Sequence, residues 1–274
     1  MPIGNYLAEC IEGNSLRRMC RRQLHRWIGV FDAHTHLRMK PILASLHALI
    51  ATSSSLRVLD YGCGSGLLAF EAMRRIRKTQ NKIQFEYHGV DQNEEAVGSA
   101  IATRRKLTAK KIIPDNSLRF SKVEKGVFFS EVVQEEFDVV VLADVFEHIE
   151  NDALFLLELS AFVRSGSLLL ISVPTHRYPK IFGEKFHREI GHVREGYTSE
   201  ELNALLAKVG WQIDKRSYNT GLISSVCCML LYRALYPFQR LKIILLLFLY
   251  PLFTIDLLCS ERFAVSMFVQ ARKL

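Results

Sequence analysis

The stretch LDYGCGSG, Leu59–Gly66, lies where an apolar run ends and a helical pattern begins. Glycine stands at three alternating positions of this stretch, and glycine accepts backbone conformations that other residues avoid. Its lack of a side chain also lets a ligand approach the main chain. A helix that starts directly after such a loop presents its free N–H groups at the same place. The stretch therefore predicts a ligand-binding turn between a strand and a helix.

Strand-like apolar runs alternate with helix-length segments between about residues 55 and 220. Five of the runs end at Asp60, Asp91, Val123, Asp144 and Pro174. The segments 67–78, 94–106 and 152–163 carry apolar residues at three- and four-residue spacing, which is typical of helices. Strands that alternate with helices predict an α/β fold in which a parallel sheet is covered on both faces.

One more helix and two more strands are expected towards the end of the chain. Thr198 and Glu201 have the spacing of a capping box at the start of a helix, and Gly210 is a typical helix stop. The last two strands are expected over residues 211–218 and from residue 262 to about residue 272.

The glycine spacing and two acidic residues at strand ends distinguish between two ligand classes, a dinucleotide and a nucleoside that carries an amino acid. A dinucleotide fingerprint needs a glycine at the sixth position counted from Gly62, where this chain has Leu67. Asp60 suits a cationic or amino-bearing ligand better than a pyrophosphate. Asp91 ends the second strand, where a carboxylate accepts both hydroxyls of a ribose. The pattern indicates a nucleoside that carries an amino acid.

The composition is that of a globular chain with a basic balance. The 274 residues, 49% hydrophobic and 23% charged, suffice for one large or two small domains. The formal net charge of +8 favours an anionic partner, which could be nucleic acid, a membrane surface or an acidic substrate. Six cysteines without metal-type spacing favour a reducing compartment, and the first residues show no secretory signal. A cytoplasmic location is expected.

Five motifs follow one another in a fixed order along the chain. They are VLDYGCGSG (58–66), GVDQN (89–93), FDVVVLADVFEHI (137–149), LLLISVP (168–174) and GHVREGYTSEEL (191–202). With these motifs the chain resembles the class I S-adenosylmethionine-dependent methyltransferases, in the small-molecule branch of ubiquinone-pathway and glycan- or lipid-modifying enzymes. The resemblance implies a Rossmann-like, doubly wound sheet of seven strands, mostly parallel with an antiparallel last strand. It also implies S-adenosylmethionine as cofactor.

The resemblance assigns the cofactor contacts residue by residue. The loop around the methionine part comprises Asp60, Tyr61, Gly62, Cys63, Gly64 and Gly66. Asp91 is expected to bind the ribose, Gln92 to lie beside the adenine and Asp144 to lie at the cofactor edge. Many relatives have an acid after the third strand, whereas this chain reads SKVEK, so adenine contacts through Ser121 or Glu124 stay open. The alternative is that the glycines only shape a turn and the acids only cap helices.

The segment after the fourth strand carries the candidate catalytic residues Glu147 and His148. His148 has a side chain whose ordinary pKa suits removal of a hydroxyl proton from an acceptor. Some ubiquinone-pathway enzymes that the chain resembles bind a divalent metal here through an acid-x-x-Glu-His motif, which Asp144, Glu147 and His148 match in spacing. A purely structural histidine is the third interpretation. A metal is the least favoured of the three, and no residue is assigned to one.

The stretch from residue 176 to residue 197 lies where such folds build a lid over the substrate, and it is rich in Arg, Lys, His and Tyr. Tyr178, His192 and Arg194 are the candidates for recognising an acidic or phosphorylated acceptor through charge-assisted hydrogen bonds. The alternative is a solvated loop with no role in binding.

An apolar insertion at residues 221–260 separates the last two strands and is expected to overhang the acceptor entrance. Its uncharged run, 243–255, is shorter than the roughly 20 residues that span a bilayer, and Pro251 and Asp256 interrupt it. Arginines and lysines flank the apolar runs, as in helices that lie in an anionic membrane interface: Arg233, Arg240 and Lys242. Packing on the sheet or a dimer interface is the alternative.

The N-terminal region is predicted to be helical and to lie over the cofactor. Its basic cluster could make a second membrane contact and contains Arg17, Arg18, Arg21, Arg22 and Arg26, followed by Trp27. The segment with His34, His36 and Arg38 is interpreted as a lid, because the two histidines have no convergent third ligand for a metal.

These patterns together predict an enzyme that methylates a small or lipid-linked acceptor, by O-methylation, at a membrane surface. The expected domains are a helical lid (1–54), the core (55–220), the hydrophobic insertion (221–260) and the final strand (261–274). A non-catalytic, membrane-docked S-adenosylmethionine-binding protein is the alternative. A nucleic-acid methyltransferase is disfavoured because the chain lacks an N/D-P-P-Y motif, and a nicotinamide dehydrogenase is the least favoured class. The acceptor and the oligomeric state stay open.

Overall fold

The computed structural model describes residues 33–79, 82–124, 136–229, 252, 255–256 and 261–274. The N-terminal arginine cluster and most of the apolar run 243–255 lie outside these residues. Within the described part of the chain, no helix is both long and apolar enough to cross a bilayer.

A seven-stranded sheet forms the centre of the structure, with the strand order β3-β2-β1-β4-β5-β7-β6. The strands are β1 (Ser55–Tyr61), β2 (Gln84–Asp91), β3 (Leu118–Lys122), β4 (Phe137–Ala143), β5 (Val163–Pro174), β6 (Trp211–Thr220) and β7 (Ser266–Lys273). Strands β1 to β5 pair in parallel, whereas β7 runs antiparallel to both β5 and β6. The predicted Rossmann-like sheet is confirmed. The last strand starts later than expected, because residues Glu261–Phe263 form a short 3₁₀ helix.

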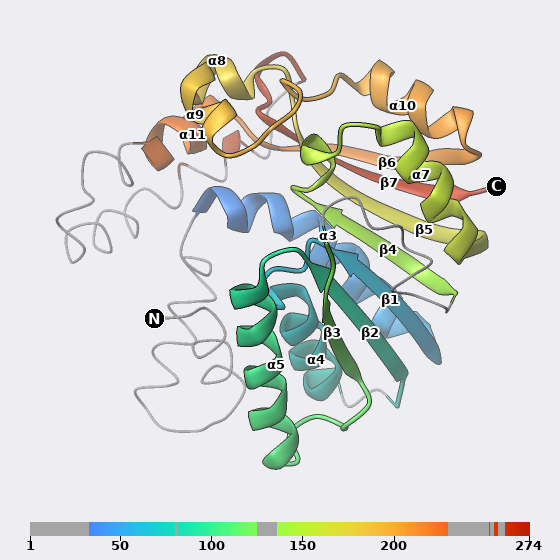
Figure 1. Cartoon of the computed structure of the whole chain (residues 1–274). Helices are drawn as coiled ribbons and strands as arrows, with labels where there is room; N and C mark the ends of the chain where they lie inside the picture. Colours follow the sequence, from blue (N-terminus) through green and yellow to red (C-terminus); the bar gives the residue numbers. More distant parts are fainter. Residues whose placement is uncertain (1–32, 80–81, 125–135, 230–251, 253–254, 257–260) are drawn as a thin grey trace, which may run out of the picture.

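Helices cover both faces of the sheet (Figure 1). They are α3 (Ala33–Thr52), α4 (Leu67–Thr79), α5 (Glu94–Ala109), α7 (Asp152–Leu159), α8 (Tyr178–Phe182), α9 (Glu184–Glu189), α10 (Ser199–Lys208) and α11 (Leu222–Met229). Short 3₁₀ helices lie at Phe146–His148 and Ser160–Phe162. Figure 1 shows α8, α9 and α11 gathered beyond one end of the sheet.

Two apolar cores lie on opposite sides of the sheet, as the alternation of strand side chains requires. Val139 and Val141 of β4 face one core, which includes apolar residues of α3, α4 and α5. Val140 and Leu142 face the other core, which includes residues of α7 and α10. The inner residues of β4 and β5, Val139–Leu142 and Leu168–Ile171, are thus apolar on both faces, which explains the uninterrupted apolar runs in the sequence.

The start and end of α10 follow the sequence signals. The Thr198 hydroxyl accepts from the Glu201 amide at 3.1 Å, and the Glu201 carboxylate accepts from the Thr198 amide at 2.8 Å, which confirms the capping box. Gly210 has a φ of 77° directly after the helix, in the left-handed region that glycine favours.

The strand order reverses between β1 and β4, since β2 and β3 lie on one side of β1 and β5 lies beyond β4. In open parallel sheets, ligands bind at the carboxyl ends of the strands at such a reversal. Asp60 and Asp91, at the ends of β1 and β2, and Asp144, directly after β4, therefore lie at the expected binding edge.

Gly62 allows two of these loops to pack together, and its replacement tests that packing. Its φ is 84°, and a Cβ there would meet Val145 Cγ2 at 2.1 Å. We expect Gly62→Ala to lower the free energy of unfolding by at least about 2 kcal/mol, through left-handed strain and overpacking. Urea denaturation measures the change. Gly98→Ala in α5, where a Cβ meets nothing within 4 Å, is the control and should stabilise the helix by about 0.5–1 kcal/mol. Equal effects of the two variants would contradict the argument.

Candidate cofactor and acceptor site

The glycine loop after β1 is held by backbone hydrogen bonds to the end of β2. The amides of Gly62 and Cys63 both donate to the Val90 carbonyl, at 2.7 and 3.0 Å. Gly66, with a φ of 83°, lies against the rings of Phe70 and Phe120. Gly64 differs, because a Cβ at this position would meet nothing within 4 Å. The loop is thus closely packed on its protein side, while Gly64 adjoins open space from which a ligand can reach the main chain.

Asp60 is a buried carboxylate at the carboxyl end of β1, with 1% of its surface exposed. The Tyr87 hydroxyl donates to its Oδ2, whereas its buried Oδ1 has no hydrogen-bond partner among the described residues. Burial raises the pKa of Asp60 to about 7, the charge of Asp91 adds to the rise, and the Tyr87 hydrogen bond opposes it. An amino-bearing ligand at the loop would favour the ionised carboxylate, so Oδ1 of Asp60 is a suitable acceptor for the ammonium of a methionine part.

Asp91 connects the loops after β1 and β2. Its Oδ2 accepts from the Gly64 amide at 2.7 Å, and its Oδ1 accepts from the Asn93 amide at 2.8 Å. Each carboxylate oxygen has more than one acceptor site, so ribose hydroxyls can be accepted as well. The neighbouring Gln92 is exposed.

The two open candidates for adenine contacts differ in their surroundings. The Ser121 hydroxyl lies 3.0 Å from His88 Nε2, which engages it within the protein. Glu124 is exposed beyond the end of β3. No local pattern predicted the contact between Ser121 and His88.

Asp144 follows β4 in the left-handed region, with a φ of 57°. Its amide donates to the Ser172 carbonyl at 3.0 Å, and its carboxylate forms an ion pair with Arg38 of α3. Arg38 therefore links α3, the helix that precedes β1, to the loop after β4. Sequence reasoning named Arg38 only as part of a lid, and a single arginine in a helix gave no further signal of this role.

Glu147 lies in the 3₁₀ helix that follows β4 and is 1% exposed. Its buried Oε2 has no hydrogen-bond partner among the described residues. Burial raises the pKa of Glu147 to about 8, and the nearby charge of Asp144 adds to the rise, while Arg38 opposes it. The carboxyl group is thus held in an environment that disfavours its charged form.

His148 and His192 face each other next to Glu147, with ring centroids 4.7 Å apart. His148 Nδ1 lies 3.0 Å from the Gly191 carbonyl; a carbonyl only accepts, so in the neutral imidazole the proton is on Nδ1 and the lone pair is on Nε2. His192 Nε2 lies 3.8 Å from Glu147 Oε1, and its Nδ1 lies 3.0 Å from His187 Nδ1. Burial, with the nearby His148 and His187, lowers the pKa of His192 to about 3. His192 is therefore neutral.

Four predicted residues, Glu147, His148, Tyr178 and His192, thus come together, since the ring of Tyr178 lies 5.3 Å from that of His192. Sequence reasoning missed His187, which is buried and contacts His192. The sequence signal that could have indicated this contact was the short separation of five residues between His187 and His192.

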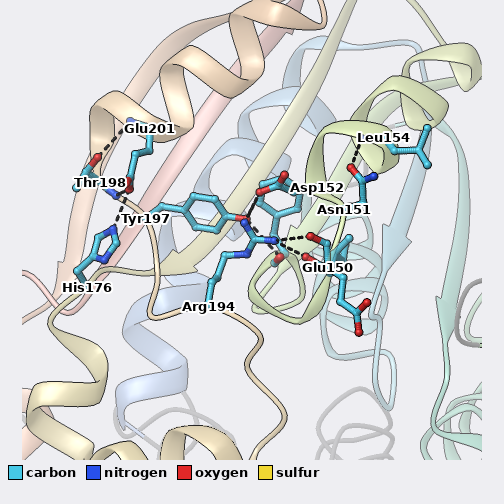
Figure 2. Close-up of polar contacts among 11 residues, drawn as sticks. Glu150, Asn151, Asp152, Leu154, His176, Arg194, Tyr197, Thr198 and Glu201 are labelled. Atoms are coloured by element: carbon cyan, nitrogen blue, oxygen red, sulfur yellow. Dashed lines mark hydrogen bonds and ion pairs between the residues drawn. The ribbon is translucent and has the colours of Figure 1, made fainter.

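Arg194 lies in a different network from this cluster (Figure 2). Its guanidinium forms an ion pair with Asp152 and donates to the carbonyls of Ile149 and Glu150, at 2.5 and 3.1 Å. The Tyr197 hydroxyl donates to the same Asp152 carboxylate at 3.0 Å. These contacts hold the lid against the start of α7 and favour a structural role for Arg194.

Residues 31–216 match the model of a methyltransferase domain family. The chain belongs to this methyltransferase family. S-adenosylmethionine is the cofactor of the family, and the geometry of the glycine loop, Asp60 and Asp91 fits it.

Two curated proteins that the chain resembles are also methyltransferases. The chain is 23% identical over 155 residues to a ubiquinone biosynthesis O-methyltransferase of Rickettsia typhi, covering 54% of this chain and 55% of the relative. A second such enzyme, of Rickettsia prowazekii, is also 23% identical. The chain thus spans about half the length of the curated relatives it matches.

Two solved structures share the fold. One is magnesium protoporphyrin IX methyltransferase from Synechocystis PCC 6803 with bound S-adenosylmethionine, at a TM-score of 0.51 and 16% identity, covering 99% of this chain and 91% of that chain. The other is an S-adenosylmethionine-dependent methyltransferase from Mesorhizobium loti, at a TM-score of 0.53 and 14% identity, covering 86% and 98%.

The buried carboxyl of Asp60 makes stability depend on pH. Its folded-state pKa of about 7 lies above the ordinary value of 3.8, so the folded protein binds more protons between these values and loses stability as the pH rises through them. Asp60→Asn removes this loss and keeps an acceptor for Tyr87. We expect the cofactor-free variant to gain up to about 4 kcal/mol over wild type between pH 4 and pH 8. Urea denaturation across this range checks it, with exposed Asp115→Asn as control. A constant difference between Asp60→Asn and wild type would contradict it.

Proposed function

We propose that this chain transfers the methyl group of S-adenosylmethionine to an oxygen of a small or lipid-linked acceptor, at a membrane surface. The observation that carries the proposal is the shared edge of the sheet. The glycine loop with Asp60 and Asp91 lies at the ends of β1 and β2. Glu147 and His148 follow β4, the strand next to β1, and His192 reaches them from the segment between α9 and α10. A cofactor site and an acid–base cluster are thus adjacent.

S-adenosylmethionine supplies an electrophilic methyl group when bound. The chain's own residues would hold it through Gly64, Asp91 and Asp60, with Asp144 and Arg38 closing the edge beside it. Alignment of the acceptor and exclusion of water would supply most of the rate gain. The buried surroundings of Glu147 and His192 suit exclusion of water.

His148 is the residue best placed to remove the acceptor proton. Its Nε2 keeps a lone pair because Nδ1 donates to the Gly191 carbonyl. His148 Nε2 would take the hydroxyl proton as the acceptor oxygen bonds to the methyl carbon, whose bond to the sulfonium sulfur breaks to leave S-adenosylhomocysteine. Tyr178 and His192 form the wall of the acceptor side, and the name of the Rickettsia relatives supports oxygen as the methylated atom.

Methyl transfer can be tested with methyl-labelled S-adenosylmethionine, purified protein and host extract separated into organic-soluble and aqueous fractions. We expect wild-type protein to label an organic-soluble product. Asp91→Asn should lower the rate at least about 10-fold, because hydrogen bonds to a charged acceptor are lost.

The matched control is Asp115→Asn, an exposed acid outside the site, which should keep the wild-type rate. Label confined to water-soluble product would refute the lipid-linked acceptor. Cofactor binding without label in either fraction would favour the non-catalytic alternative instead.

The described part of the insertion supports membrane contact. Leu222, Ile223 and Val226 of α11 are exposed large apolar side chains on neighbouring turns of the helix. Leu252, Ile255 and Phe263 are exposed as well. The guanidinium groups of Arg177 and Arg262 lie 5.9 and 5.7 Å from the Phe263 ring centroid. Apolar side chains bordered by cations suit an anionic lipid interface.

The insertion is also anchored to the acceptor side of the fold. Asp256 Oδ2 accepts from the amides of Gly221 and Ser224, at 3.0 and 2.6 Å, which joins the two ends of the insertion. Helix α11 packs against α8, which begins at Tyr178 of the acceptor wall. A bilayer against α11 would therefore lie near the acceptor entrance.

Vesicle co-sedimentation tests this contact. We expect wild-type protein to bind vesicles of phosphatidylglycerol and phosphatidylcholine and the double variant Ile223→Glu/Val226→Glu to bind at least about 10-fold more weakly, since two apolar side chains are replaced by charges. Leu154→Glu/Leu157→Glu changes two exposed leucines of α7 and is the control. Equal losses in both double variants, or no binding by wild type, would refute the docking of α11.

A further inference from the structure

We propose that Glu147, His148 and His192 form a binding site for a divalent transition-metal cation, with the third ligand supplied by the lid rather than by Asp144. The inference deepens the acceptor side of the proposed function. One ligand atom of each residue lies within 4.8 Å of the others. Metal–ligand bonds of about 2.0–2.2 Å place ligand atoms roughly 3–4 Å apart, so a small inward adjustment of the side chains completes the site.

Both histidines are already oriented for metal binding by partners on their other nitrogen. His148 Nδ1 contacts the Gly191 carbonyl, and His192 Nδ1 contacts His187 Nδ1, each at 3.0 Å. Histidine ligands are commonly fixed in this way by a second hydrogen bond. The arrangement leaves Nε2 of both rings for a cation. In this arrangement the buried His187 positions the ring of His192.

Glu147 provides an independent indication. It is 1% exposed, and its buried Oε2 has no hydrogen-bond partner in the described part of the chain. Burial of an unpartnered carboxylate oxygen is unfavourable, and such atoms are rare in folded proteins. A cation held between Glu147 and the two histidines would satisfy this oxygen and offset the buried charge.

Asp144, which matches the acid-x-x-Glu-His spacing in the sequence, is committed elsewhere. It forms the ion pair with Arg38, and its Oδ1 lies 3.4 Å from the Ser172 hydroxyl. Two imidazoles and one carboxylate suit Zn²⁺, Mn²⁺, Co²⁺ or Fe²⁺ better than Mg²⁺ or Ca²⁺, which prefer oxygen ligands. Such a set leaves a position for an acceptor oxygen, which a bound cation would make more acidic. His148 Nε2 would then be a ligand in the loaded protein and a proton acceptor in the metal-free protein.

The test measures metal binding by the full chain without cofactor or acceptor, so that it stands or falls separately from methyl transfer. Protein treated with EDTA is titrated with Co²⁺, followed by visible absorption and by isothermal calorimetry. We expect one Co²⁺ per chain. His192→Ala should weaken binding at least about 100-fold, and His187→Asn about 10–100-fold through loss of positioning.

Matched variants separate the two possible ligand sets. Asp144→Asn should change the affinity less than about 3-fold, and His176→Asn, an exposed histidine of the lid, should leave it unchanged. His192→Asp keeps a ligand type and should recover part of the affinity and of the absorption band that His192→Ala loses. This recovery shows that the loss in His192→Ala is not a failure to fold.

The proposal is overturned if wild-type protein binds no Co²⁺ at a one-to-one ratio, or if Asp144→Asn weakens binding while His192→Ala does not. If methyl label is absent but Co²⁺ binding follows the expected pattern, only the proposed transfer fails. If label is transferred fully after EDTA treatment and no Co²⁺ binds, only the metal site fails.

Discussion

The contact between the Gly62 backbone and the Val145 side chain is the constraint on which the site depends. Because Gly62 has no side chain, the loop after β4 lies directly against the loop after β1. The amides of Gly62 and Cys63 then reach the Val90 carbonyl, which ties both loops to the end of β2. Three loops that are far apart in sequence are thereby fixed at one edge. The positions of Asp60, Asp91 and Asp144 follow from this packing.

The same edge holds carboxyl groups in surroundings that disfavour their charge. Asp60 and Glu147 are both almost fully buried, and burial raises the pKa of each. Each has one oxygen without a hydrogen-bond partner among the described residues. Such groups lower the stability of the protein when it is unliganded. Buried, unpartnered carboxyl groups close to the carboxyl ends of two adjacent strands are typical of ligand-binding sites.

Much of the fold could be predicted from the sequence because its signals are local. Apolar runs, capping residues such as Thr198 and the glycine loop each depend on a few neighbouring residues. The parallel arrangement follows from the alternation of strands and helices. The late start of β7 could not be predicted, since the 3₁₀ turn at Glu261–Phe263 has no strong local signal.

The candidate site was less predictable because its side chains meet across long distances in the sequence. The ion pair of Arg38 with Asp144 and the contact of His192 with Glu147 each join different elements. Spacing within one segment grouped Asp144 with Glu147 and His148, whereas the folded chain pairs Asp144 with α3 and brings His192 in from the lid. Local spacing carries no information about which distant partner a side chain will find.

The lid illustrates how one short motif combines positioning with chemistry. Residues 191–197 run beside residues 147–152: the Val193 amide donates to the Glu147 carbonyl at 3.0 Å, and Arg194 donates to two carbonyls and pairs with Asp152. His192 lies between the Gly191 carbonyl, which contacts His148 Nδ1, and the Val193 amide, so its distance from Glu147 is set on both sides. Arg194 therefore helps to hold His192 in register from a separate network of contacts. Since the Val193 amide donates to the Glu147 carbonyl, part of this register depends on the path of the backbone alone.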